Sequence, residues 1–338
     1  MTHYPAPNFA HLFALTGPYG TYEHAKFDQP RVEQGYCVDD VARVLVVALR
    51  ETSMSTQLSA LVEQSLDFLV QSQTPLGIFR NRRSAEGIFC DEAYCDDSWG
   101  RAMWALGACI ASLPSHEQRA TALALFSRGT LVTSHHHRSL AFAILGASEV
   151  LSVYPTNVAA LSLMLRVPSP TREEAGVGWL WSEPRLTYAN AVLPEAMMIA
   201  GQVLGDEALV LTGLEQLAWL LNRSTAEGYL SVTPTAGAGP EYDGHRFDQQ
   251  PIEVAAMADA CSRAHDLTGH PAWLDGVTAA ADWFMGANDG RVVMYDPSTG
   301  GGFDGLTPWG PNLNQGAEST LSFLSTMQRA RQYALGAS

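Results

Sequence analysis

Apolar residues recur at intervals of three and four along much of this chain, and this spacing predicts helices. Six segments are rich in Ala, Leu and Met and carry few charges beyond their first turn, as expected of helices packed on nearly all sides. These predicted buried helices span residues 38–50, 99–111, 139–150, 193–204, 252–264 and 317–333.

More amphipathic segments lie between the buried ones, and signals for strands are scarce. The amphipathic helices are predicted over residues 57–71, 117–125, 158–165, 207–221 and 273–285, with a short opening helix over 9–15. Buried helices begin about every 40 to 65 residues, which is the period of one helix pair. An open array would need polar caps, which neither chain end supplies. We therefore expect an all-α fold, an (α/α)6 toroid of six inner and six outer helices that spans residues 1–338 as a single domain.

The composition narrows the possible partners. Acidic residues number 35 against 20 basic ones, which leaves a net charge of -15. Nucleic acids and anionic membranes require clustered Lys and Arg, so neither is expected as a partner. A neutral sugar suits this charge better, although acidity also serves solubility alone. The chain itself does not indicate an oligomeric state.

No segment predicts secretion, membrane insertion or metal binding. The first residues lack a basic stretch followed by an apolar core, and no apolar run approaches the roughly 20 residues of a membrane span. The five cysteines have no zinc-like spacing, and three adjacent histidines at 135–137 point in different directions on a helix. We expect a cytoplasmic protein without metal or cofactor.

Paired aspartates lie at the start of two of the inner helices. In a closed ring the N-termini of all inner helices face one rim, where their exposed N–H groups suit carboxylates and hydroxyls. Asp39 and Asp40 lie at the start of the first inner helix, and Asp96 and Asp97 precede the second. Aspartate is also a favoured N-cap residue, so one member of each pair has a structural alternative. The second member is expected to point into the cleft.

Three glutamates occupy equivalent positions, one turn into successive inner helices. These are Glu195, Glu253 and Glu318. A carboxylate on a buried helix must be paired or face a wet cavity, because burying a lone charge is costly. A capping-box role is the structural alternative. Amide side chains precede the three helices, namely Asn190, Gln249, Gln250, Asn314 and Gln315.

Other residues of the same loops are candidates for sugar binding. Aromatic rings beside carboxylates and amides are typical of carbohydrate sites, although packing explains any single ring equally well. Asp304 lies in a glycine-rich segment that fits a loop over the cleft better than a phosphate loop. The remaining candidates are Tyr36, Trp99, His136, Tyr188, Asp248 and Trp309.

Several sequence segments resemble those of a family of bacterial glycosidase-like proteins that is often associated with glycosyltransferases. The matching stretches are residues 22–25, 35–43, 97–102, 247–253 and 312–320. The resemblance covers nearly the whole chain and implies an (α/α)6 barrel that works on carbohydrates such as mannosides or glucosides. The sequence departs from the family phrase at Ala189, where the family carries Asp.

The predicted function is inverting hydrolysis of a glycoside by two carboxylates. A general acid protonates the leaving oxygen, and a second carboxylate activates water across the cleft. Asp97 or Glu253 is the candidate acid, and Asp40 or Glu318 is the candidate base. An apolar wall favours the raised pKa that an acid needs, which suits Glu253 better.

Three other functions stay open at this stage. A sugar epimerase or isomerase would use His24, His136 and His245. A glycoside phosphorylase would need cations for phosphate, and the candidates are Arg31, Arg43 and Arg101. A non-catalytic carbohydrate-binding module would keep the aromatic residues and lose only affinity when carboxylates are removed. Fold analogy supports all of these, so the site has to discriminate between them.

Overall fold

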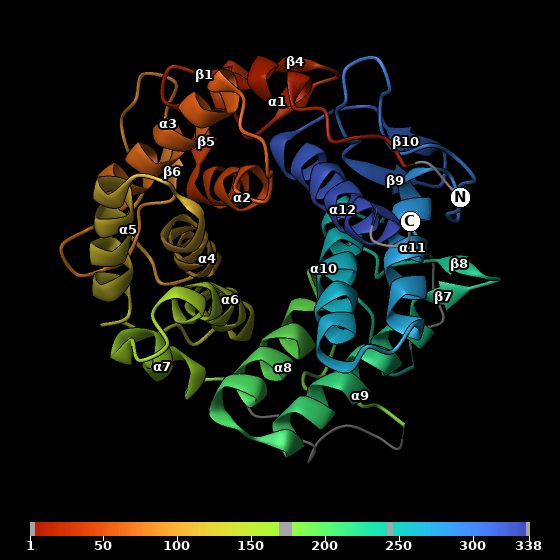
Figure 1. The fold of residues 1–338 in the computed structure, drawn as a ribbon. Coiled ribbons are helices and arrows are strands. Elements are labelled where there is room, and N and C mark those ends of the chain that lie inside the picture. The colour runs from red at the N-terminus through yellow and green to blue at the C-terminus, as the bar shows by residue number, and fades with distance from the viewer. Residues whose placement is uncertain (1–3, 169–177, 242–245, 336–338) are drawn as a thin grey trace.

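The computed structural model describes residues 4–168, 178–241 and 246–335, and within these ranges it forms twelve α-helices arranged as two concentric rings (Figure 1). The inner ring consists of α2 (Val38–Ala48), α4 (Asp97–Ser112), α6 (His137–Val153), α8 (Val192–Leu204), α10 (Pro251–Thr268) and α12 (Ala317–Leu335). The outer ring consists of α1 (Ala10–Ala14), α3 (Thr56–Ser72), α5 (His116–Gly129), α7 (Val158–Met164), α9 (Glu207–Arg223) and α11 (Ala272–Phe284).

Each inner helix contacts the next one, and α12 returns to contact α2, so the ring is closed. The predicted all-α toroid is therefore confirmed, including the short opening helix. Four outer helices, α3, α5, α7 and α9, begin with side-chain caps that satisfy exposed N–H groups, as Ser55 does for α3 and Asp206 for α9. Their buried faces pack against the inner ring.

Small residues allow inner helices to approach closely. A Cβ atom added at Gly100 of α4 would lie 2.2 Å from the carbonyl oxygen of Ser139 in α6. A Cβ atom at Gly107 of α4 would likewise lie 2.2 Å from the carbonyl oxygen of Gly146 in α6. The abundance of Gly and Ala in the predicted inner helices thus reflects backbone-to-backbone packing.

Short antiparallel strand pairs, which the sequence did not indicate, form within the connecting loops. The pairs are β1 (Thr16–Gly17) with β2 (Gly20–Thr21), β3 (Ala25–Lys26) with β4 (Gln29–Pro30), β5 (Tyr36–Cys37) with β6 (Arg82–Arg83), β7 (Thr225–Ala226) with β8 (Tyr229–Leu230), and β9 (Gly305–Thr307) with β10 (Gly310–Asn312). A 3-10 turn, η1, covers Val32–Gln34. These pairs hold the long loops in place at their junctions with the barrel. In the described part of the chain, none of the helices has the length and apolar character needed to cross a membrane.

Candidate active site

A cavity lies at the end of the barrel where α2 and α12 begin, and we call it the rim cavity. Five of the residues predicted from sequence line it: Asp39, Asp40, Gln250, Asp304 and Glu318. It is also lined by Glu23, His24, Cys37, Arg43, Asn312, Gly316 and Ser319. The prediction that loops before the inner helices gather polar groups at one rim is confirmed for these elements.

Arg43 organises the centre of the rim cavity. Its two terminal nitrogens bind Asp40 of the same helix and Glu318 of α12, each at 2.5 Å. Asp40 is buried, and this burial raises the pKa of its carboxyl group, while the charge of Arg43 opposes the rise. The side chain of Glu318 is 35% exposed and so remains accessible from the cavity.

Asp39 has a different environment from that of its neighbour. Its Oδ2 accepts a hydrogen bond from the Asn81 amide at 2.9 Å, and its Oδ1 lies 3.3 Å from Nε of Arg101. Burial raises the pKa of Asp39 to about 6, although Arg101 and Arg43 pull it down. A carboxyl group with a pKa of about 6 can both donate and accept a proton close to neutral pH, as a general acid or base must.

A second polar network joins α4, α6 and α10 through the loop before α8. The Tyr188 hydroxyl donates to Asp97 at 2.6 Å, and Arg138 donates to the Tyr188 carbonyl oxygen. Arg138 also donates to Asn190, whose amide in turn donates to Glu253 at 2.8 Å. Asp97, Tyr188, Asn190 and Glu253, all predicted from sequence as site residues, are therefore linked in one network through Arg138.

Glu253 is buried within this network. Burial raises the pKa of its carboxyl group to about 7, and the hydrogen bonds from Asn190 moderate the rise. Its Oε1 has no hydrogen-bond partner in the described structure. Glu253 does not line the rim cavity, so its carboxylate is less accessible there than that of Asp39.

The barrel axis contains a second, small cavity, which we call the central cavity. Arg43 borders both cavities, so they are neighbours. The central cavity is mostly apolar, with Trp104, Phe142 and Leu321 in its wall. Glu195, also predicted from sequence, lines this cavity, and burial raises the pKa of its carboxyl group to about 7.

Several residues predicted as site residues have structural roles in the wall of the barrel. Asp96 caps α4 by accepting from Ser98, the structural alternative considered above. Tyr36 and Trp99 are fully buried; Tyr36 stacks on Tyr22, and Trp99 donates to the carbonyl oxygen of Gly129. These two rings do not face the rim cavity, because each fills the space between an inner and an outer helix.

The remaining candidates hold loops or face solvent. Gln249 and Gln315 are buried and bind neighbouring loops, the first through Asp289 and the second through Asp296. Asn314 accepts from the backbone N–H of Phe27. The others are exposed outside the described cavities: Asp248, His136 and the 95% exposed Trp309.

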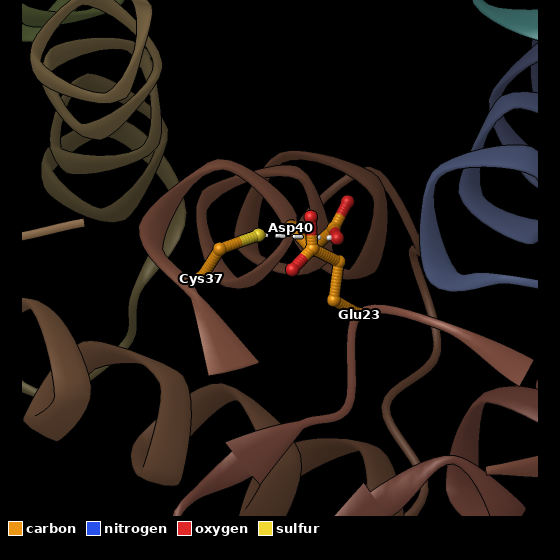
Figure 2. Close-up of side chains that lie close together, drawn as sticks. All are labelled: Glu23, Cys37 and Asp40. Atoms are coloured by element: carbon orange, nitrogen blue, oxygen red, sulfur yellow. Dashed lines mark hydrogen bonds between the residues drawn. The ribbon is translucent and has the colours of Figure 1, made fainter. Parts of the chain in front are cut away.

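One group of side chains in the described residues has the proximity of a metal site. Donor atoms of Glu23, Cys37 and Asp40 all lie within 4.8 Å of one another (Figure 2). The Cys37 thiol donates to Asp40 at 3.2 Å, and burial raises the pKa of this thiol well above its usual value. Arg43 and Arg82 already pair with the two carboxylates. These contacts balance the cluster without requiring a cation.

Sequence reasoning missed most of the partners that hold the site. Arg138 pairs with Glu183 through both carboxylate oxygens, at 2.9 and 2.8 Å, yet neither residue was singled out. Asn81 was overlooked because it lies in a loop far from the aspartate that it binds. Arg43 and Arg101 were considered only as phosphate ligands. The i, i+3 spacing of Asp40 and Arg43 was the one available signal for these contacts. His245, named for the epimerase alternative, lies outside the described residues.

No protein-family model matches this chain, and no curated protein matches it. Its fold is nevertheless shared with solved (α/α)6 structures. A sugar epimerase from a ruminal bacterium superposes with a TM-score of 0.72 at 12% identity, covering 95% of each chain. The similarity at this identity defines the class of fold, an (α/α)6 barrel.

Two further solved structures illustrate the range of proteins with this fold. A D-mannose isomerase has a TM-score of 0.68 at 10% identity and covers 96% of this chain and 95% of its own. A family 76 α-mannanase from Bacteroides thetaiotaomicron has a TM-score of 0.64 at 12% identity, covering 96% and 93%. Isomerases and hydrolases thus share the architecture, so the fold alone does not select the reaction.

Proposed function

We propose that this protein is a carbohydrate-active enzyme that hydrolyses a glycosidic bond in the rim cavity with inversion at the anomeric carbon. The observation that carries the proposal is the contrast between two cavity-lining carboxylates. Burial raises the pKa of Asp39 to about 6, whereas Glu318 is one-third exposed and ion-paired with Arg43. Titratable groups held in such different environments are typical of an acid and a base that act together.

In this mechanism Asp39 is the general acid. Its carboxyl proton passes to the glycosidic oxygen as the bond from that oxygen to the anomeric carbon breaks. Glu318 accepts a proton from a water molecule, whose oxygen bonds to the anomeric carbon from the opposite face. Arg43 orients Glu318, and Arg101 orients Asp39.

This assignment differs from the sequence-based choice of acid. Asp97 is bonded to the Tyr188 hydroxyl, and Glu253 is bonded to the Asn190 amide. Both carboxylates lie in the network beside the cavity, where we propose that they position the loop before α8. Asp40 is buried against Cys37 and Arg43, so we assign it to holding Arg43 in place.

Product analysis on α- and β-linked mannosides, glucosides and galactosides tests the proposal. Asp39→Asn and Glu318→Gln should each lower turnover by about 10²- to 10⁴-fold, the usual contribution of a general acid or base. Matched controls are Asp67→Asn and Glu63→Gln on the exposed face of α3, which should retain activity. The anomer of the first product, read by NMR, should be inverted. Full activity in Asp39→Asn would exclude the assigned acid, and a requirement for phosphate would indicate a phosphorylase.

A second candidate function is epimerisation or isomerisation of a free sugar. It is favoured by His24, which lines the rim cavity and whose charge acts on Asp304. The similarity to the sugar epimerase and D-mannose isomerase folds supports the same candidate. Incubation of free aldoses in D2O discriminates the two functions. Incorporation of deuterium at C2 of the product by the wild type, but not by His24→Asn, would favour epimerisation or isomerisation over hydrolysis.

A further inference from the structure

The opposite end of the barrel contains another pocket, which we call the basal pocket. Its wall includes Arg50, just beyond the end of α2, and Ser112, the last residue of α4. The basal pocket shares Glu195 and Trp104 with the central cavity but has no residue in common with the rim cavity. It is therefore separated from the proposed reaction site by the central cavity.

Arg50 and Arg329 form the floor of the basal pocket, and behind them lies Asp259 of α10, which lines the central cavity. Arg50 approaches this carboxylate to 3.0 Å and Arg329 of α12 to 2.6 Å. All three side chains are at least four-fifths buried, with exposures of 17%, 20% and 7%. Two guanidinium groups therefore share the single carboxylate of Asp259, and the three side chains together retain an excess of one positive charge.

A third guanidinium adds to this excess. Arg263, one turn beyond Asp259 in α10, lines the same pocket. The side chain of Arg263 forms no hydrogen bond or ion pair within the described ranges, although its charge acts on Glu195. Because burial raises the pKa of Glu195 to about 7, this carboxyl group offsets only part of a positive charge at neutral pH.

Two further carboxylates line the pocket, and of these Asp266 is exposed and Glu149 is half-buried. Asp266 is in the last turn of α10 and accepts a hydrogen bond from the Tyr333 hydroxyl at 2.9 Å. Glu149 lies near the end of α6. The floor, with two guanidinium groups on one carboxylate, is therefore positive, whereas Asp266 is exposed to solvent. A buried positive excess is costly unless an anion compensates it.

We propose that the floor of the basal pocket binds a phosphate group through Arg50, Arg263 and Arg329. The planar fork of arginine matches the oxygens of phosphate, and several such forks converge here. The phosphate belongs either to inorganic phosphate or to a phosphorylated sugar. Since the whole chain carries a net charge of -15, non-specific attraction does not account for binding of an anion.

Calorimetric titration of the full chain with inorganic phosphate tests this site independently of any enzymatic activity. Sodium chloride at equal ionic strength is the reference. Arg263→Gln should weaken phosphate binding about tenfold or more, because a hydrogen bond to a charged group is lost. Arg31→Gln, which removes a half-exposed arginine on the outer surface, should bind like the wild type.

Glucose 6-phosphate distinguishes the two sources of the phosphate group. Tighter binding than that of inorganic phosphate, again weakened in Arg263→Gln, assigns the pocket to a sugar phosphate. Equal affinities assign it to free phosphate. The proposal is overturned if neither compound binds at millimolar concentration, or if Arg263→Gln binds both as well as the wild type does. Circular dichroism of the variant checks that it is folded.

Discussion

The guanidinium group of Arg43 in α2 binds the carboxylate of Glu318 in α12 at 2.5 Å, across 275 residues of sequence. This contact joins the first and last helices of the inner ring, and it lies in the wall of the rim cavity. Closure of the barrel and formation of the carboxylate site therefore depend on the same side chain.

Replacing Arg43 should destabilise the fold as well as the site. Arg43→Met leaves Asp40, which is only 3% exposed, without its cation, and breaking a buried pair in this way costs about 3 to 5 kcal/mol. Urea denaturation at pH 7 measures the loss. Combining Arg43→Met with Asp40→Asn should recover part of the stability, because the stranded charge is then removed. An unchanged unfolding midpoint in the single variant would contradict the role of this contact.

The activity of the wild type should depend on pH through Asp39. As the proposed acid, Asp39 must be protonated, so kcat/KM should fall as pH rises through about 6, the pKa set by its burial. Asp39→Asn should show low activity without this alkaline limb. A pH series of initial rates on the best glycoside checks the prediction. Persistence of the same limb in Asp39→Asn would assign it to another group.

Glu253 should make stability decrease with rising pH. Burial raises the pKa of its carboxyl group from 4.5 in the unfolded chain to about 7 in the fold, so the folded state binds this proton more tightly. The resulting stabilisation is complete below pH 4.5 and is lost as pH rises through about 7.

Glu253→Gln is therefore expected to match the wild type near pH 4 and to exceed its stability at pH 8, by up to about 3 kcal/mol. The Asn190 amide can still donate to the new side-chain oxygen. Chemical denaturation at both pH values provides the measurement, with Glu63→Gln as an exposed control. Equal stabilities of the wild type and Glu253→Gln at pH 8 would mean that burial of the Glu253 carboxylate does not destabilise the fold.

Adding a methyl group at the interface of α4 and α6 should disrupt the inner ring. A Cβ atom at Gly146 would lie 2.2 Å from the carbonyl oxygen of Met103, so Gly146→Ala forces the two helices apart. Overpacking of this kind costs about 1 to 3 kcal/mol. Gly239→Ala is the control, because its nearest neighbour is a flexible Arg185 nitrogen at 3.8 Å. Thermal denaturation should separate the two variants clearly.

Trp309 should matter for binding and not for folding. Its side chain is 95% exposed in the turn between β9 and β10, whose flanking residues Asp304 and Asn312 line the rim cavity. Trp309→Ala should leave the unfolding free energy within about 0.5 kcal/mol of the wild type. It should raise KM for longer oligosaccharides more than for short ones. Equal effects on both substrates would argue against stacking of a sugar on this ring.

The sequence alone was sufficient to predict the architecture of this protein. Periodic apolar positions, small residues and few charges identified all six inner helices, because a helix packed on every side shows this pattern locally. The polar loops before those helices likewise predicted which end of the barrel gathers carboxylates. Asp39, Asp40 and Glu318 were predicted at this end, and they line the rim cavity.

Only the tertiary structure decided which carboxylates face a cavity and in what electrostatic state. Asp39 and Asp96 occupy similar places in the sequence, yet one lines the rim cavity and the other caps its own helix. Likewise Glu253 is held by Asn190, and Glu318 by Arg43. Burial and distant partners set these differences, and neither is encoded in local spacing because both arise when segments far apart in the chain close into a ring.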